Sequence, residues 1–174
     1  MIKLKSLLEF KGKTLHVYDF DDTLAKSEAY IYVKKANGQS VTLTPEEFAV
    51  YDEQPGDKFD FSDFNRMLRN AKPINRNIQL IRKSLNDPNV KTTILTARAI
   101  AFPIRHFFKK TFGVEPYVVA VGSSDPMKKA NWIENHLRKG YSNVFFTDDS
   151  LKNLAAVDKL KDKYPTANIV TKVA

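Results

Sequence analysis

Residues 14–24 of the chain read TLHVYDFDDTL, an apolar segment that runs into three aspartates. The β-branched and aromatic residues at 14–18 predict a strand that ends at Asp19. Side chains alternate along an extended backbone, so Asp19 and Asp21 are expected to project to the same side of the strand end. Two carboxylates so close repel each other unless a cation or a shared proton relieves the charge. Taken alone, however, an Asp-rich segment after a strand is more typical of a turn than of a site.

Four further apolar segments repeat this pattern and alternate with helical ones. Strands are predicted at residues 92–96, 117–121, 143–147 and 167–173, and their nearly continuous apolar character indicates burial on both faces of a parallel sheet. Apolar residues spaced three and four apart predict helices over 74–85 (with Pro73 in its first turn), 104–112, 132–137 and 151–160. The alternation predicts an α/β fold, a doubly wound, Rossmann-like parallel sheet of about five strands. Such sheets bind ligands at the carboxyl ends of their strands.

Residues 26–72 interrupt the alternation, because they are too long for a plain connection between a strand and a helix. Within them, Asn37-Gly38 is a hairpin signal between the segments 30–35 and 40–43. The sequence TPEE at 44–47 has the pattern of a helix capping box, which predicts a short helix.

A second short helix is expected within residues 59–70, beginning near Ser62. We therefore expect a single domain over residues 1–174. It would carry a small cap-like insertion of a hairpin and short helices, at about 26–72, over the mouth of the sheet.

The composition fits one globular domain, because 43% of the 174 residues are hydrophobic. Lys and Arg total 28 and Asp and Glu total 20, which gives a formal net charge of +8. This charge suits phosphorylated ligands, nucleic acid first among them, and the alternative is an inert basic surface kept for solubility.

The absence of cysteine excludes disulfides, thiolate zinc sites and cysteine nucleophiles. No apolar run is long enough to span a membrane, and residues 1–13 lack the pattern of a signal peptide, so we expect a cytoplasmic monomer without membrane contact.

A second acidic pair, Asp148-Asp149, also follows an apolar strand and precedes a helical segment. If the strands at 14–18 and 143–147 are both central in the sheet, the four carboxyl groups of Asp19, Asp21, Asp148 and Asp149 converge on one cleft. An all-oxygen set of ligands without Cys or His suits Mg²⁺. Two unrelated acidic turns would have to reach equivalent strand ends by chance to produce the same pattern.

Two other strand ends carry groups that suit a phosphate. Thr96 and Arg98 follow the second strand, and Lys128 and Lys129 begin the helix after the third. A hydroxyl, free backbone N–H groups and a lysine together can bind phosphoryl oxygens. Helical spacing favours Lys129 over Lys128 as the lysine that faces the sheet. Arg98 could hold a second phosphate or a substrate backbone, or it could be a solvated side chain at the strand end.

These motifs, in this order, resemble those of the haloacid dehalogenase-like (HAD) superfamily. Residues 19–24, DFDDTL, look like its first motif, DxDxT. Thr96 matches its second motif, Lys128 or Lys129 its third, and Asp148-Asp149 its fourth. All four motifs in the family's order are a far more specific signal than DxDxT alone.

The resemblance implies a role for each site residue. Asp19 would be the nucleophile that forms an aspartyl-phosphate, and Asp21 the general acid and then the general base. An Asp at position 21 is what the family's phosphatases have and its dehalogenases lack. Mg²⁺ would be held by Asp19, the backbone carbonyl of Asp21 and Asp148, with Asp149 nearby or coordinating through water. Thr96 and the lysine would bind the phosphoryl oxygens.

The resemblance therefore implies a Mg²⁺-dependent phosphomonoester hydrolase. In this family a small cap usually accompanies an open site and large substrates. The basic charge, and the similarity of Thr96-Ala97-Arg98 to phosphatase modules of nucleic-acid repair enzymes, phage-encoded ones included, favour a polynucleotide end phosphate. A nucleotide or a small phosphometabolite is the alternative substrate. The alternative class is a non-enzymatic, basic nucleic-acid-binding domain built on a HAD scaffold.

Overall fold

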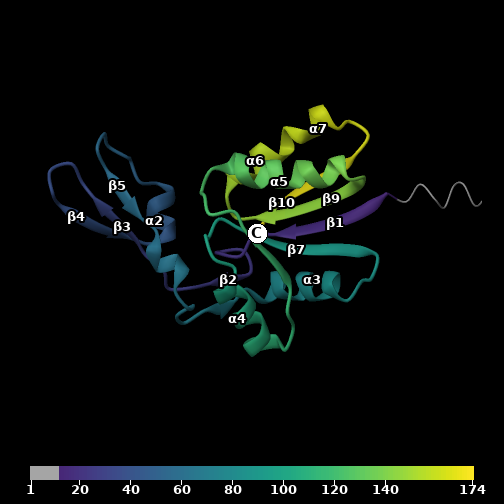
Figure 1. Ribbon diagram of the computed structural model, residues 1–174, viewed down its shortest axis with the longest axis horizontal. Helices are drawn as coiled ribbons and strands as arrows, with labels where there is room; N and C mark the ends of the chain where they lie inside the picture. Colours follow the sequence, from purple (N-terminus) through teal and green to yellow (C-terminus); the bar gives the residue numbers. More distant parts are fainter. Residues whose placement is uncertain (1–11) are drawn as a thin grey trace, which may run out of the picture.

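A computed structural model describes residues 12–174, which form a mixed α/β fold around a five-stranded parallel sheet (Figure 1). All five strands predicted from the sequence are present, in the order β10-β9-β1-β7-β8. Their bounds are β1 (Lys13–Tyr18), β7 (Val90–Thr96), β8 (Tyr117–Ala120), β9 (Tyr141–Asp148) and β10 (Asn168–Val173).

Strand β1 lies in the middle of the sheet, and its register determines which residues meet at the carboxyl edge. Tyr18 pairs with Ile94 of β7 on one side and with Thr147 of β9 on the other. The backbone N–H of Asp19 then donates to the Thr147 carbonyl at 2.9 Å, which extends the ladder by one residue. Asp19 and Asp148 therefore leave the sheet beside each other.

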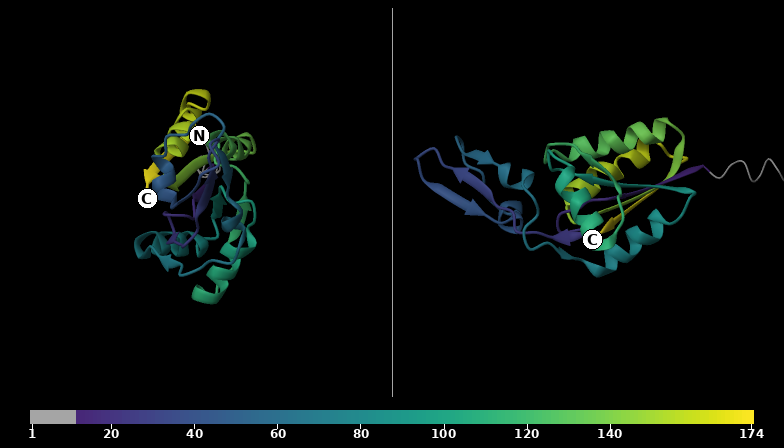
Figure 2. Two further views of the ribbon diagram at one scale, coloured as in Figure 1. Left: turned by 90° about the vertical axis from the view of Figure 1, so that its left-hand side faces the viewer. Right: turned by 60° about the horizontal axis from the view of Figure 1, so that its bottom comes forward.

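Helices cover both faces of this sheet (Figure 1; Figure 2). On one face, Ile81 of α3 (Asn75–Leu85) and Phe108 of α4 (Phe102–Phe112) pack in one apolar cluster with Ile94 of β7. On the other face, α5 (Pro126–Arg138), α6 (Leu151–Asp158) and the short α7 (Leu160–Lys163) bury a second cluster with Val17 and Phe146. The strands are thus apolar on both sides, as expected for a parallel sheet between two helical layers.

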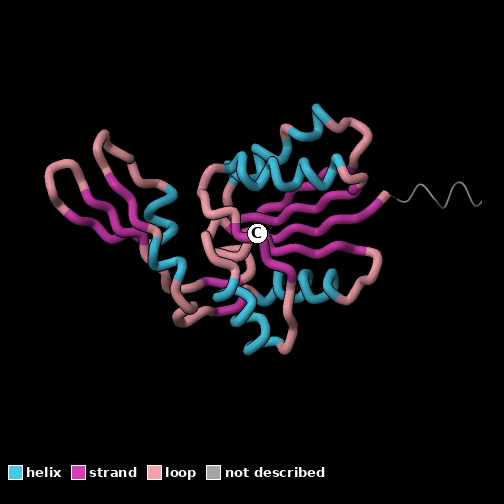
Figure 3. The backbone as a smooth tube through the Cα atoms, in the orientation of Figure 1, coloured by secondary structure: helices cyan, strands magenta, loops and turns pink. Residues whose placement is uncertain are grey.

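The insertion is a small three-stranded antiparallel sheet that lies beyond the carboxyl end of the parallel strands (Figure 3). It contains β3 (Ile31–Lys34), β4 (Ser40–Leu43), α2 (Pro45–Ala49), β5 (Lys58–Asp60) and the 3₁₀ turn η1 (Ser62–Asn65). The hairpin and the capping box expected from the sequence are confirmed. In the box, Glu47 N–H donates to Thr44 Oγ1 at 3.2 Å and Thr44 N–H donates to the Glu47 carboxylate at 2.8 Å.

The chain leaves and re-enters the main domain at one place. There β2 (Ala25–Lys26) pairs antiparallel with β6 (Lys72–Pro73). Ile74 N–H also donates to the Leu24 carbonyl at 2.9 Å, and Glu28 N–H to the Arg69 carbonyl at 3.1 Å. The two ends of the insertion are therefore held together by backbone hydrogen bonds.

Two local predictions are wrong in part. The helix expected within 59–70 begins at Ser62, as predicted, but it is only the 3₁₀ turn η1 and ends at Asn65, and Phe59 lies in β5, paired with Val33 of β3. Pro73 does not lie in the first turn of α3, because it pairs with Ala25 in β6, and α3 begins at Asn75. In both cases a strand pairing distant in sequence overrides the local helical signal.

Within residues 12–174, none of the helices is long and apolar enough to cross a membrane. The expectation that the N-terminus is not a signal peptide concerned residues 1–13, of which 1–11 lie outside the described residues.

Candidate active site

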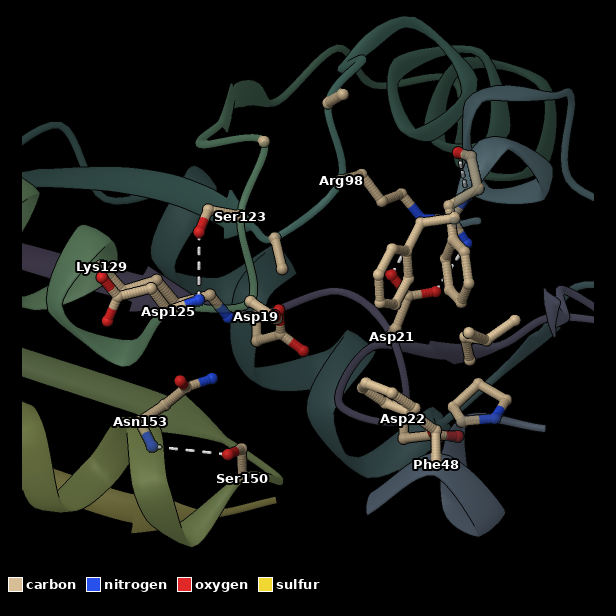
Figure 4. A pocket seen from close by; sticks show the side chains of 18 of the residues that line it. Asp19, Asp21, Asp22, Phe48, Arg98, Ser123, Asp125, Lys129, Ser150 and Asn153 are labelled. Carbon is tan, nitrogen blue, oxygen red and sulfur yellow. Dashed lines mark hydrogen bonds and ion pairs between the residues drawn. The ribbon is translucent and has the colours of Figure 1, made fainter. Parts of the chain in front are cut away.

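A cavity of about 670 Å³ lies between the carboxyl edge of the parallel sheet and the insertion (Figure 4). Its floor carries the aspartates that follow β1 and β9, together with Lys129 of α5. Its other wall comes from α2 and η1 of the insertion. Six of the seven candidate site residues line this cavity: Asp19, Asp21, Arg98, Lys129, Asp148 and Asp149.

Lys129 joins the two acidic motifs. Its Nζ donates to Asp19 Oδ1 at 2.6 Å and to Asp148 Oδ2 at 2.7 Å, and all three side chains are buried. Lys129 reaches the floor because α5 begins at Pro126, capped by the Asp125 carboxylate, which accepts from Met127 N–H at 2.9 Å. Lys128, one residue earlier, is exposed. The structure therefore brings Lys129 into the site, as helical spacing favoured, and leaves Lys128 in solvent.

Asp148 is held by a residue that sequence reasoning missed. The Asn153 Nδ2 group donates to both Asp148 oxygens, at 3.1 and 3.0 Å, and Ser150 N–H donates to Oδ1 at 2.8 Å. Ser150 caps α6 and Asn153 lies in its first turn. A polar residue one turn into a helix that follows an acidic pair is the signal that could have identified Asn153.

Asp149 is oriented by the first motif. Its backbone N–H donates to Thr23 Oγ1 at 3.1 Å, and that hydroxyl donates to Asp149 Oδ1 at 3.4 Å. One carboxylate oxygen from each of Asp19, Asp148 and Asp149 lies within 4.8 Å of the others. Three carboxylates with one lysine leave an excess of negative charge, and the donors are all oxygen. This set fits Mg²⁺.

The charge balance of the floor is visible in its pKa shifts. Burial raises the pKa of Asp19 well above its usual value; Lys129 opposes this effect, and the carboxylates of Asp148 and Asp21 add to it. Burial, and then Asp148, raise the pKa of Asp149. Although burial disfavours its ammonium form, Asp19 and Asp148 raise the pKa of Lys129. A bound cation would stabilise the charged carboxylates against both the burial and the mutual repulsion that raise their pKa values.

Asp21 turns away from this cluster and binds Arg98. The guanidinium donates from Nε to Oδ2 at 2.8 Å and from Nη2 to Oδ1 at 2.6 Å, a two-point contact. Arg98 also donates from Nη1 to the Phe64 carbonyl of the insertion at 2.7 Å. The alternative of a solvated side chain is wrong, because Arg98 is only 4% exposed between Asp21 and the insertion, and its role toward a phosphate stays a prediction.

Thr96 lies beneath the cavity wall. It is fully buried, and its hydroxyl accepts a hydrogen bond from Arg98 N–H at 3.2 Å. The wall at this strand end consists of Ala97, Arg98 and Ala99. In this structure Thr96 shapes the turn that carries Arg98, and its role toward a phosphate stays a prediction.

No family model, curated protein or solved structure matches the chain. Its function is therefore inferred from the chemistry of its own residues. The floor combines two buried carboxylates bridged by a lysine, a third carboxylate within reach of the same cation, and an aspartate held by an arginine.

Asp22, between the motif aspartates and the insertion, has a left-handed backbone (φ 55°) and is partly buried. Burial, and then the charges of Glu46, Asp149 and Asp21, raise its pKa from 3.8 to about 6. The folded chain therefore binds more protons than the unfolded chain between these two values. The contribution of Asp22 to the free energy of unfolding consequently falls as pH rises from about 4 to about 6.

Replacing Asp22 by Asn should remove this cost, since Asn tolerates the left-handed region. We expect Asp22→Asn to raise the free energy of unfolding by about 1 kcal/mol at pH 7, a figure reduced for solvent screening of a half-buried group. At pH 4 the variant and the wild type should be equally stable. Urea denaturation in EDTA at both pH values measures the difference, and an equal gain at both would show that the charge is not its cause.

Proposed function

We propose that the chain is a Mg²⁺-dependent phosphomonoester hydrolase of the HAD type, on a doubly wound, Rossmann-like sheet with a small cap. The observation that carries the proposal is the position of Lys129, which bridges Asp19 and Asp148 at the carboxyl edge. A lysine in this place can bind a phosphoryl oxygen while it keeps a nucleophilic carboxylate beside a cation site. The resemblance to the four HAD motifs supports the same assignment.

Mg²⁺ would be held by Asp19, Asp148 and Asp149, whose oxygens lie within 4.8 Å of one another. The backbone carbonyl of Asp21 would complete the set that the family resemblance implies. When bound, the ion supplies positive charge that offsets the phosphoryl oxygens. Asn153 and Thr23 orient Asp148 and Asp149 through the hydrogen bonds described above.

The reaction follows from the two aspartates of the first motif. An oxygen of Asp19 bonds to phosphorus as the bond from phosphorus to the leaving oxygen breaks, and Asp21 gives that oxygen a proton. Water then attacks the aspartyl-phosphate while Asp21 takes its proton, and release of phosphate restores both carboxyl groups. In this structure Arg98 donates to both oxygens of Asp21 and Ser27 Oγ donates to Oδ1 at 3.3 Å, so the proton that Asp21 gives and takes would lie on the remaining lone pair of Oδ2.

Asp21→Asn tests this role. The variant keeps the shape of the side chain and an acceptor for Arg98, but it cannot donate a carboxyl proton. We expect turnover to fall about 10²- to 10⁴-fold on alkyl phosphates, and less on aryl phosphates, whose leaving groups need no proton. Steady-state kinetics on both substrate types make the comparison. Equal losses on the two would contradict the role of Asp21 as an acid.

The substrate class we favour is a polynucleotide end phosphate, with a nucleotide or a small phosphometabolite as the alternative. The net charge of +8 supports the first choice. The deciding experiment is phosphate release with Mg²⁺ and with EDTA across an aryl phosphate, nucleotides, sugar phosphates and oligonucleotides phosphorylated at either end. Clear preference for oligonucleotide ends would support the proposal, and preference for small phosphates would support the alternative. Release from none of them would leave a nucleic-acid-binding module.

A further inference from the structure

The side of the cavity opposite the acidic floor is aromatic. Three phenylalanines line this aromatic wall: Phe48 of α2, Phe61, which immediately precedes η1, and Phe64 within η1. Phe61 is 39% exposed, as is Tyr32 of the same small sheet, whereas Phe48, Phe59 and Phe64 are more fully buried. An exposed phenylalanine inside a charged cavity is available to a ligand.

Phe61 is also held in place. Its ring centroid lies 5.4 Å from that of Phe48, with the two planes at 84°, and 6.2 and 6.5 Å from the rings of Phe59 and Phe64. Neighbouring aromatic contacts of this kind restrict the ring without covering it. A ligand that stacks on Phe61 therefore meets a surface that is already ordered, which lowers the entropic cost of binding.

This wall is joined directly to the proposed acid. The Arg98 guanidinium lies 5.0 Å from the Phe64 ring centroid, donates to the Phe64 carbonyl and binds Asp21 at two points. In the proposed reaction, Asp21 faces the leaving oxygen. The group that carries this oxygen, rather than the phosphoryl group itself, would therefore lie along the aromatic wall.

We infer that Phe61 is a stacking platform for a nucleobase, the base of the nucleotide whose phosphate lies at Asp19. The inference rests on the proposed function and names its substrate class. A planar base suits an aromatic face, and such stacking is worth a factor of about 5 to 150 in affinity. The cavity of about 670 Å³ is far larger than a phosphate needs and has the size of a small-ligand site. Ser62 and Asn65 on the same wall offer polar groups to the edge of a base.

The test compares Phe61→Leu, which keeps apolar volume and removes the ring, with Phe61→Trp, which restores a ring. Tyr117→Leu is the matched control, since Tyr117 is also an exposed aromatic residue (57%) but lies at the start of β8, away from the carboxyl edge. The substrates are glycerol phosphate, phenyl phosphate, thymidine 3′- and 5′-monophosphate, and an oligothymidylate phosphorylated at either end.

We expect Phe61→Leu to lower kcat/KM about 5- to 150-fold on the thymidine substrates, through KM rather than kcat. Turnover of glycerol phosphate should not change, Phe61→Trp should restore the thymidine values, and Tyr117→Leu should equal wild type. The ratio of kcat/KM on the phosphorylated oligothymidylates to kcat/KM on the thymidine monophosphates shows whether the stacked base belongs to a polynucleotide end or to a free nucleotide. Equal losses on all substrates, or a loss as large on phenyl phosphate, would overturn the inference.

Failure of the proposed function gives a different result. If wild type releases no phosphate from any substrate with Mg²⁺, that function is wrong, and thymidine monophosphate binding is measured by calorimetry instead. Binding that weakens in Phe61→Leu and returns in Phe61→Trp would still support the platform. Binding that is absent, or unchanged in Phe61→Leu, would overturn it.

Discussion

Replacing Asp19 by Asn is expected to reduce phosphate release on the order of 10⁴-fold or more while the chain stays folded. An amide cannot form the acyl phosphate, yet Asn has the same shape as Asp and still accepts a hydrogen bond from Lys129. Burial already raises the pKa of Asp19, so the charged carboxylate is costly at this position. Losing that charge should therefore cost little stability. Phosphate release and circular dichroism on the same preparation measure both effects.

The matched control for this variant is Asp162→Asn, an exposed aspartate on α7, which should keep full activity. Activity in Asp19→Asn above about one per cent of wild type would contradict a nucleophile at this position. In that case water would have to attack the phosphate directly, with the acidic floor serving only to bind the cation.

Replacing Lys129 by Met should have the largest effect on stability. Met keeps most of the apolar volume but leaves the buried carboxylates of Asp19 and Asp148 without their shared cation. Removing one partner of a buried ion pair usually costs about 3–5 kcal/mol, so we expect a loss of that size in the free energy of unfolding in EDTA. Lys128→Met, an exposed neighbour in the same helical turn, should change it by less than about 0.5 kcal/mol. Urea denaturation of the two variants gives the comparison.

Mg²⁺ should restore part of the stability lost in Lys129→Met, because a cation bound by Asp19, Asp148 and Asp149 supplies positive charge where the ammonium was. Activity should not return, since the phosphoryl oxygens have lost a ligand. Denaturation across a Mg²⁺ titration follows this recovery. A variant as stable as wild type in EDTA would show that the bridge does not hold the two motifs together.

The parallel sheet and the convergence of the acidic motifs were predictable, because both follow from local patterns. Apolar, β-branched segments define the strands. Parallel strands bring their carboxyl ends to one edge, which is enough to place Asp19 near Asp148. Helical spacing likewise distinguished Lys129 from Lys128. The strands, the meeting of the acidic motifs and the choice of Lys129 can all be predicted without knowing which residues distant in sequence are in contact.

The features that sequence reasoning missed depend on such distant contacts. Arg98 is buried because a carbonyl of the insertion, at Phe64, and the carboxylate of Asp21 both accept from it. The aromatic side of the cavity combines Phe48 of α2 with Phe61 and Phe64 at η1, and no single helical or strand period joins all three. Phe59 becomes a strand residue only because β3 offers a partner. In each case the decisive neighbour lies across the fold.

The pairing of β2 with β6 has a consequence for how such a chain can diversify. Because the polypeptide departs and returns at adjacent points, the intervening residues 27–71 form a cassette whose exchange leaves the order of the parallel strands untouched. The Arg98 guanidinium contacts this cassette through the main-chain carbonyl of Phe64 and through Ser27 Oγ at 3.0 Å, so a replacement would have to keep a hydroxyl at its first residue. In the proposed enzyme, the residues that select the substrate would lie in this cassette, and the reacting carboxylates of Asp19 and Asp21 would lie outside it.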